Sequence, residues 1–246
     1  MVILRRDPAH RPRAAARPRR IKITPLRILI LLAVLVIGIG GGGYALLKGW
    51  EPSRARYPVQ GITISSANGP INWLATRGSG IDFAYLVATS GSTQRDASFA
   101  TNLESAKAFG LTNGAIHRYS LCASATAQAT AFIATVPRDA AMLPPVVALA
   151  FSPLCPARPS RDRLLAELNI FLNQIEAHGG KPAILRLSHE VEAAYDLSSG
   201  INRTLWLEGE FLPPGYAARP WVMWTASTWR RVPGIEGPIE WDVVRP

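Results

Sequence analysis

The sequence predicts an α/β protein: a TIM-like (β/α) barrel preceded by a single N-terminal transmembrane helix. Three observations lead to this fold class. Residues 28–47 form a run of twenty residues without a charge. From Val59 onward, strand-like and helix-like segments alternate, which is typical of a parallel sheet. The segment 144–151, PPVVALAF, has the length and apolar content of a strand that is buried on both faces.

The positive charge of the chain is concentrated at the N-terminus. Residues 1–27 carry nine basic side chains against the single acid Asp7, whereas residues 49–246 carry 17 basic and 16 acidic side chains. The high isoelectric point of 10.3 therefore belongs to the N-terminus and not to the body of the protein. We predict no nucleic-acid partner.

The uncharged run is long enough, as a helix, to cross a hydrocarbon core of about 30 Å. A cleaved signal peptide is the alternative, but the basic region and the apolar run are both long, and no clear small-residue cleavage site precedes Lys48. The positive-inside rule gives a single-pass topology in the cytoplasmic membrane. We predict a cytoplasmic tail at 1–27, an anchor at 28–48, a tether at 49–58 and a periplasmic or extracellular barrel at 59–246.

The elements of the barrel follow from apolar spacing and from the residues that bound each segment. The helix that begins at Ser160 has an N-cap residue and apolar side chains at helical spacing as far as Ile175. The predicted helices span residues 97–109, 124–136 and 160–178. The predicted strands span residues 59–65, 82–89, 114–119, 144–151, 183–187, 204–207, 221–224 and 239–243.

The strand 144–151 carries the central observation on function. Residues two apart on a strand point to the same face, so Ala148 and Ala150 project together. In a parallel barrel, side chains at the C-terminal ends of the strands face the site of chemistry. Two methyl groups therefore occupy positions where reactive side chains are expected.

Short motifs in the same order along residues 59–243 carry a resemblance to a known family. They are Gly61–Ser65 (GITIS), Gly69–Trp73 (GPINW), Gly80–Gly91, Asp96–Asn102, Gly114–His117, Pro144–Val147, Leu205–Trp206, Trp221–Trp224 and Val232–Pro238. The sequence resembles the glycoside hydrolase family 25 lysozymes. The resemblance implies a distorted (β/α) barrel that acts on the glycan strands of peptidoglycan at N-acetylmuramic acid.

The resemblance also implies carboxylates that this chain lacks. The family's Asp-x-Glu pair falls on Ala148 and Ala150, its first-strand Asp on Thr63, and a further Glu on Ser90. Its late Asp falls, within a residue or two, on Glu240. Glycoside hydrolysis needs a proton donor and a negative partner, and losing the donor alone costs roughly 10²–10⁴ in rate. We therefore expect a catalytically degenerate domain.

Other acids are candidates for relocated catalysis. Glu208 follows the strand 204–207 and Glu240 lies on the last strand, so we name both as candidate catalytic residues. The alternative for each is a solvated or capping carboxylate. The distance between two carboxyl groups, which decides the mechanism, is a property of the folded chain.

Six further side chains are predicted to contact a ligand: Tyr85, His117, Arg118, Arg186, Trp206 and Trp224. The three aromatic side chains either stack on sugars or fill the barrel, and His117 either lines the cleft or is a hydrogen-bonded core residue. The two arginines either bind an acidic group, such as a peptide-stem carboxylate, or pair with Glu190 or Glu208.

The two cysteines, Cys122 and Cys155, each follow a predicted barrel strand. In an oxidising compartment an even pair indicates a disulfide. No histidine or second cysteine lies at metal-ligand spacing, so we predict neither a metal nor a cofactor.

Three hypotheses about function remain open at this stage. The first, which we favour, is a membrane-anchored domain that binds peptidoglycan without cleaving it. The second is an active muramidase that uses relocated carboxylates, and the third is a scaffold that engages another envelope protein. Two carboxyl groups facing each other across an open cleft favour the second, and a filled cleft favours the third.

Overall fold

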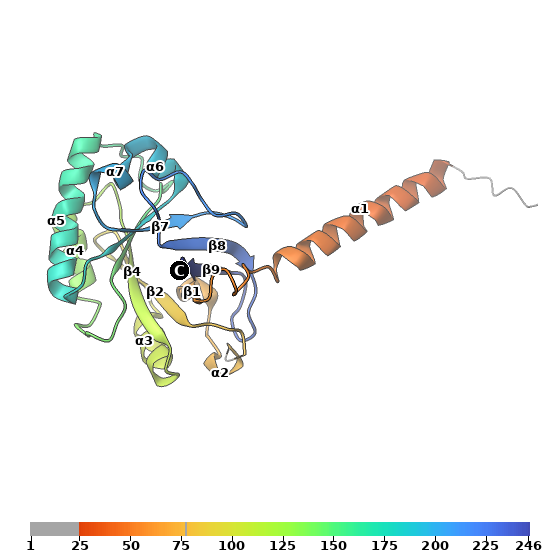
Figure 1. Cartoon of the computed structure of the whole chain (residues 1–246), viewed down its shortest axis with the longest axis horizontal. Coiled ribbons are helices and arrows are strands. Elements are labelled where there is room, and N and C mark those ends of the chain that lie inside the picture. The colour runs from red at the N-terminus through yellow and green to blue at the C-terminus, as the bar shows by residue number, and fades with distance from the viewer. Residues whose placement is uncertain (1–24, 77) are drawn as a thin grey trace, which may run out of the picture. The chain divides into compact units, whose positions relative to one another are not determined.

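The structure is a computed structural model that describes residues 25–76 and 78–246 (Figure 1). Most of the basic tail predicted at 1–27 lies outside the described residues. The chain divides into two compact units between Gly43 and Tyr44, and each unit is described by itself.

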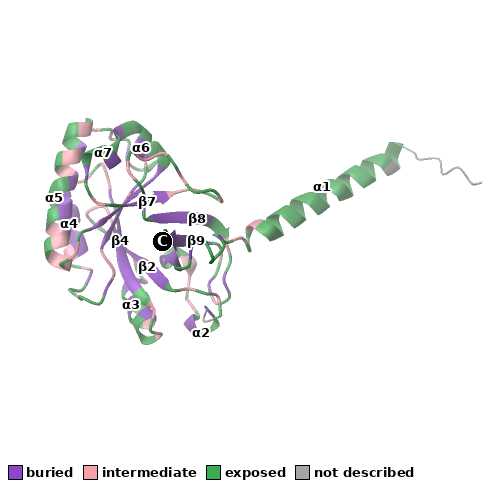
Figure 2. Ribbon diagram, viewed as in Figure 1, coloured by how far each residue is buried: buried purple, intermediate pink, exposed green. Residues whose placement is uncertain are grey.

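Helix α1 spans Pro25–Leu47 and contains the predicted uncharged run. Its segment Ile28–Leu47 is long and apolar enough to cross a membrane, and its side chains are exposed (Figure 2). A signal sequence passes the same test of length and composition, so the helix alone is weak support for an anchor.

Eight strands of the described chain close into a barrel. The order around it is β1, β9, β8, β7, β6, β5, β4 and β2, and β2 pairs back to β1. A short strand of two residues, β3 (Gln94–Arg95), pairs antiparallel with the end of β2. The barrel strands are β1 (Gln60–Ile64), β2 (Phe83–Ser90), β4 (Thr112–Arg118), β5 (Val146–Leu149), β6 (Ile184–Leu187), β7 (Thr204–Glu208), β8 (Met223–Arg230) and β9 (Ile239–Val244).

The barrel is mixed, and this corrects the prediction of a parallel TIM-like barrel. Strand β9 runs antiparallel to both of its neighbours, β8 and β1, while the other pairs are parallel. Residues 231–238 join β8 to β9, and this connection is too short for the crossover of about a dozen residues that a parallel pair requires. The alternation of strand and helix ends at β7, because no helix lies between β7 and β8 or between β8 and β9.

The helices cover only part of the barrel. In Figure 1, α4 and α5 lie together on one side of the strands and α3 lies below them. Serine side chains begin three helices: Ser124, Ser160 and Ser188 each accept a hydrogen bond from a backbone N–H of the first turn of α4, α5 and α6. The helices after α1 are α2 (Trp73–Thr76), α3 (Phe99–Ala108), α4 (Ala125–Ile133), α5 (Arg161–Gly179), α6 (His189–Tyr195) and α7 (Leu197–Gly200), with a 3₁₀ turn at Ser66–Asn68.

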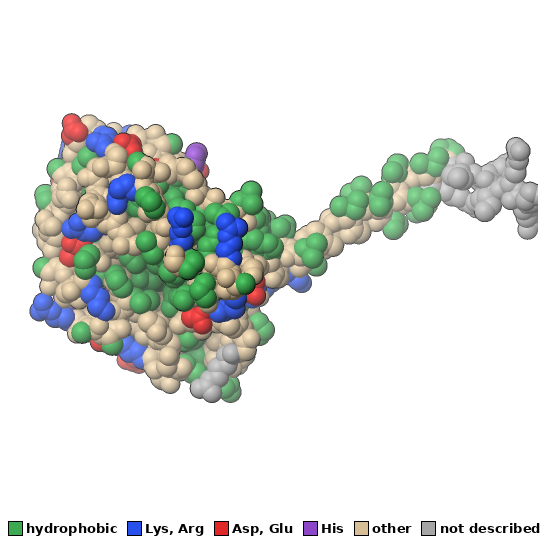
Figure 3. Space-filling model, viewed as in Figure 1, with side chains coloured by type: hydrophobic (Ala, Val, Ile, Leu, Met, Phe, Trp, Pro, Cys, Tyr) green, Lys and Arg blue, Asp and Glu red, His purple; other side chains and the backbone are tan. Residues whose placement is uncertain are grey.

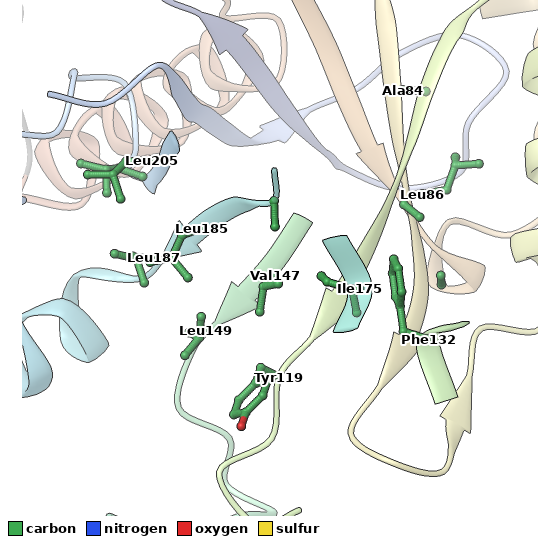
Figure 4. Packing of buried hydrophobic residues seen from close by; sticks show 14 of the residues in the cluster. Ala84, Leu86, Tyr119, Phe132, Val147, Leu149, Ile175, Leu185, Leu187 and Leu205 are labelled. Carbon is green, nitrogen blue, oxygen red and sulfur yellow. The ribbon is translucent and has the colours of Figure 1, made fainter. Parts of the chain in front are cut away.

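Two apolar cores lie on the two faces of the strands. Alternate residues of β5 separate them: Val147 and Leu149 pack outward, against the layer that contains Phe132 of α4 (Figure 4). Val146 and Ala148 point into the barrel, where they join a smaller interior cluster. Odd-numbered and even-numbered residues of β5 thus lie on opposite faces, as expected for a strand.

The segment predicted as a tether, 49–58, packs on the barrel. Tyr57 is buried and stacks on Trp221, with ring centroids 6.5 Å apart. The carbonyl oxygen of Pro52 accepts a hydrogen bond from Gln60 Nε2 at 2.9 Å. These contacts hold the segment against the outside of β1 and β8.

The predicted disulfide is confirmed. Cys122 and Cys155 are bonded, with their Cα atoms 5.8 Å apart. The bond joins the loop after β4 to the loop after β5, at the end of the barrel where the parallel strands finish.

Candidate functional site

A cleft of about 650 Å³ opens at the C-terminal ends of the parallel strands. Ala148 and Ala150 both line it, as their shared strand face predicts. The disulfide and its flanking loops form one wall, and Glu208 and Glu240 contribute to another. A smaller cavity of about 340 Å³ adjoins the cleft on that acidic side and shares both of these glutamates.

One arginine connects the two candidate catalytic acids. Arg186 Nε donates to Glu208 Oε1 at 2.9 Å, and its Nη1 donates to Glu240 Oε2 at 2.6 Å. Burial by itself lowers the pKa of Arg186, but the charges of Glu240 and Glu208 raise it overall. The guanidinium also lies 4.9 Å from the ring centroid of Trp206. Two alternatives were open for Arg186, a ligand contact or an ion pair within the protein. The structure shows the ion pair, with Glu208 and Glu240.

A third acid, Asp242, lies next to this cluster and is fully buried. Its two oxygens accept hydrogen bonds from the hydroxyl groups of Thr63 and Thr225, each at 2.8 Å. Burial raises the pKa of Asp242 to about 7, while the charge of Arg186 opposes this rise and that of Glu240 adds to it.

Asp242 was not among the predicted site residues, although a signal for it exists. Glu240 and Asp242 are two apart on a strand and therefore share a face. Thr225 was missed because the predicted strand stopped at Trp224, whereas β8 continues to Arg230. Polar side chains that face a barrel interior break the apolar run on which that prediction depended.

The remaining substituted positions also lie at the cleft. Thr63 and Ser90 line it from β1 and β2, and Arg118 lines it from the end of β4. The side chain of Thr63 is committed to Asp242. Arg118 is exposed, and it is placed where a ligand in the cleft can reach it.

His117 faces away from the cleft, contrary to its prediction as a ligand-binding residue. Its Nδ1 lies 2.8 Å from Thr89 Oγ1 and its Nε2 lies 3.1 Å from Gln128 Oε1. The ring packs against Phe171 of α5, with centroids 4.7 Å apart. Burial lowers the pKa of His117 to about 4. His117 is therefore a hydrogen-bonded core residue, which was the alternative to a ligand contact. Alternation along β4 points its side chain toward the helices.

The three predicted ligand-binding aromatic residues are buried as well. Tyr85 and Trp206 fill the barrel interior, with ring centroids 5.2 Å apart. Trp224 points outward and packs on Tyr57 and Trp221, at 5.8 and 6.2 Å between centroids. None of the three lines the cleft, so sugar stacking at the site does not come from them.

The side chains that line the cleft include two acids and several hydrogen-bonding groups. Among the described residues that line it, Glu208 and Glu240 are the acids, and both are bonded to the same guanidinium. Serine and threonine hydroxyls, Arg118 and the two glutamates offer hydrogen bonds to a polar ligand. No group of three or more His, Cys, Asp or Glu side chains in the described chain is arranged to hold a metal ion.

Comparisons with known proteins agree with this architecture. The family model described as glycosyl hydrolases family 25 matches residues 62–235. Lysozyme M1 of Streptomyces globisporus is 26% identical over 200 residues, which cover 74% of this chain and 66% of the relative. The protein YegX of Escherichia coli K12 is 28% identical over 200 residues, covering 77% and 70%.

Solved structures show the same fold. A family 25 glycosyl hydrolase from Bacillus anthracis superimposes with a TM-score of 0.72 at 24% identity, covering 80% of this chain and 92% of that one. The bacterial lysozyme from Streptomyces coelicolor gives a TM-score of 0.67 at 25% identity, covering 75% and 90%. With the family model matched over most of the barrel, this chain belongs to glycosyl hydrolases family 25.

Proposed function

We propose that this protein is a membrane-anchored, extracytoplasmic domain that binds peptidoglycan glycan strands and does not hydrolyse them. The family fold suggests peptidoglycan as the ligand, since lysozymes are among the relatives of the chain. The apolar helix α1, which follows nine basic residues, supports the anchor. The argument against hydrolysis comes from the residues that line the cleft.

The observation that carries the proposal is the pair of alanines at the mouth of the barrel. Ala148 and Ala150 line the cleft with methyl groups, which neither donate a proton nor carry a charge. A general acid must carry a proton, but Glu240 Oε2 accepts a hydrogen bond from Arg186 at 2.6 Å. Glu208 is bonded to the same guanidinium, so both glutamates of the cleft are ion-paired with Arg186.

The open cleft favours a ligand-binding domain over a scaffold whose site is filled. A volume of about 650 Å³ is within the range of small-molecule and cofactor sites. Exposed Arg118 and the hydroxyl groups around it support recognition of a polar, partly anionic glycan, such as one that carries a carboxylate. A partner protein of the envelope is not needed to explain the cleft.

An active muramidase with relocated carboxylates is the second candidate. One observation favours it: the pKa of Asp242 is raised by burial to about 7, the value suited to a general acid. However, Asp242 has no exposed surface, and both of its oxygens accept hydrogen bonds from threonines. Asp242 is also not among the residues that line the cleft.

The test is a pair of assays on the full-length protein in detergent. Binding is measured by co-sedimentation with insoluble peptidoglycan, and hydrolysis by release of reducing ends. We expect binding without hydrolysis. Ala150→Trp places a bulky ring in the cleft and should abolish co-sedimentation, whereas Ala141→Trp, exposed before the start of β5, should bind as the wild type does.

Release of reducing ends by the wild type, abolished by Glu240→Gln or Glu208→Gln, establishes the muramidase instead. Hydrolysis that survives both substitutions and is lost in Asp242→Asn points to the buried acid. Equal co-sedimentation of Ala150→Trp and Ala141→Trp removes the cleft from the binding site.

A further inference from the structure

The chain enters the barrel directly after helix α1, without a free spacer. The helix ends at Leu47, and the carbonyl oxygen of Lys48 accepts a hydrogen bond from Arg231 N at 2.9 Å. Arg230 Nη1 donates to the carbonyl oxygen of Gly49 at 2.9 Å, and Arg230 Nη2 pairs with Glu51 at 2.5 Å. Residues 48–51 are therefore fixed to the C-terminal end of β8.

Apolar side chains gather around this point of entry. Trp50 packs edge-on against Phe211, with ring centroids 5.1 Å apart. Leu212, next in the β7–β8 loop, is 76% exposed, and Trp229 near the end of β8 is 46% exposed. Figure 3 shows hydrophobic side chains over this edge of the barrel. We call the set the juxtamembrane patch: Trp50, Phe211, Leu212 and Trp229, with the basic residues Lys48 and Arg231 beside them.

One residue of the patch, Phe211, has an unfavourable backbone conformation. Phe211 has φ of 61°, in the left-handed region that bulky L residues rarely adopt. Two backbone hydrogen bonds hold the loop there, from Gly209 N to Thr225 O at 3.2 Å and from Phe211 N to Ala226 O at 2.8 Å. Leu212, the next residue, is exposed, so the strained loop presents an apolar side chain to solvent.

We propose that the juxtamembrane patch lies in the headgroup region of the bilayer that α1 spans. The uncharged segment Ile28–Leu47 is, at 1.5 Å per residue, about 30 Å long, and so its whole length is needed to cross the hydrocarbon core. The boundary of the core then falls at Leu47, and Trp50 follows within the thickness of the headgroup layer. Aromatic side chains prefer this layer, and Lys48 and Arg231 complement anionic headgroups.

The patch lies at the same end of the barrel as the cleft. Glu208 lines the cleft at the end of β7, and Phe211 follows it by three residues. Glu210, between them, lines the adjoining cavity and bonds to Thr228, next to Trp229. Contact of the patch with headgroups would therefore bring this end of the barrel to the lipid surface. This inference rests on the proposed anchor and narrows the proposed ligand to glycan that lies next to the membrane.

The experiment uses the full chain reconstituted in phosphatidylcholine vesicles that contain phosphatidylglycerol and lipids brominated near the headgroup. Bromine quenches tryptophan at short range, and the five tryptophans outside the patch are at most 9% exposed. We expect quenching of the wild type and, for Leu212→Glu, a loss of roughly half of it because a charge in the patch disfavours contact with lipid. Ile170→Glu, on the exposed face of α5, is the matched control and should be quenched as the wild type is.

A carbonate wash of the same vesicles separates this inference from the anchor. A chain that stays in the vesicles but shows no quenching, or equal quenching in wild type and Leu212→Glu, overturns the lipid contact and leaves the anchor standing. A chain that washes off overturns both. Crosslinked dimers that Leu212→Glu abolishes, without quenching, assign the patch to a second copy of the chain and overturn the lipid contact.

Discussion

At the scale of single residues, two buried titratable groups respond to pH in opposite directions. Asp242 is held between Thr63 and Thr225, and burial raises its pKa from 3.8 to about 7. His117 is held between Thr89 and Gln128, and burial lowers its pKa from 6.5 to about 4. Both groups are neutral in the folded protein at mildly acidic pH, because the barrel has displaced the water that would solvate their charges.

Whether each group makes the free energy of unfolding rise or fall with pH depends on which state, folded or unfolded, binds its proton more tightly. The contribution of Asp242 to the free energy of unfolding is complete below pH 3.8 and is lost as the pH rises to 7. The contribution of His117 is complete above pH 6.5 and is lost as the pH falls to 4. Between pH 4 and 7 the two therefore offset each other in the wild type.

The prediction concerns Asp242→Asn, an isosteric change that keeps a partner for each threonine hydroxyl. Relative to the wild type, the free energy of unfolding of this variant should rise by on the order of 3 kcal/mol as the pH increases from 4 to 8. Urea denaturation at a series of pH values measures it. Asp162→Asn, an exposed acid in the first turn of α5, is the control. A difference from the wild type that is independent of pH contradicts the raised pKa.

At the scale of elements, the disulfide organises one wall of the cleft. Cys122 and Cys155 lie in the loops after β4 and β5, and both line the cleft. Neither loop is held by helix packing alone, because both run over the surface at the end of the barrel. The covalent bond thus stabilises the fold and also fixes the position of the wall.

We predict that the double variant Cys122→Ser with Cys155→Ser loses stability and binding together. Opening a loop with a sequence separation of 33 residues should lower the free energy of unfolding by about 3–4 kcal/mol on the chain-entropy model. Co-sedimentation with peptidoglycan should weaken at a temperature where the variant is still folded. Reduced wild-type protein is the matched control and should behave as the variant does. Unchanged co-sedimentation would separate the disulfide from the site.

At the scale of the whole molecule, charge is distributed unevenly between the N-terminus and the barrel. Nine basic residues precede the uncharged segment, and the barrel beyond it is nearly neutral. A disulfide in the barrel is consistent with an oxidising compartment outside the cytoplasm. Together these features support an anchor, although a cleaved signal sequence shares the first of them.

The prediction is that full-length protein in cells fractionates with membranes and resists extraction by high salt and by carbonate. Twenty uncharged residues in a bilayer core bind far more tightly than surface charges, which salt screens. Mass spectrometry of the mature chain is the decisive measurement. A soluble form that begins near Trp50 would show that α1 is removed.

Much of the fold and the orientation of the alanine pair were predictable from the sequence. Apolar runs bounded by proline and serine marked the strands, and the period of two placed Ala148 and Ala150 on one face. The parity of the cysteines predicted their bond. These features are local or compositional, so they do not depend on how the strands are arranged around the barrel.

The tertiary structure decided what each interior side chain does. Along a strand, alternation places His117 and Trp224 on one of its two faces. Only the closed barrel determines which face points inward and which packs against the outer core. The antiparallel course of β9 pairs it with β8 and β1, which brings Asp242 to Thr63 and Thr225 across long stretches of sequence. Ion pairs and buried hydrogen bonds depend on distances between strands, and those distances exist only once the barrel has closed.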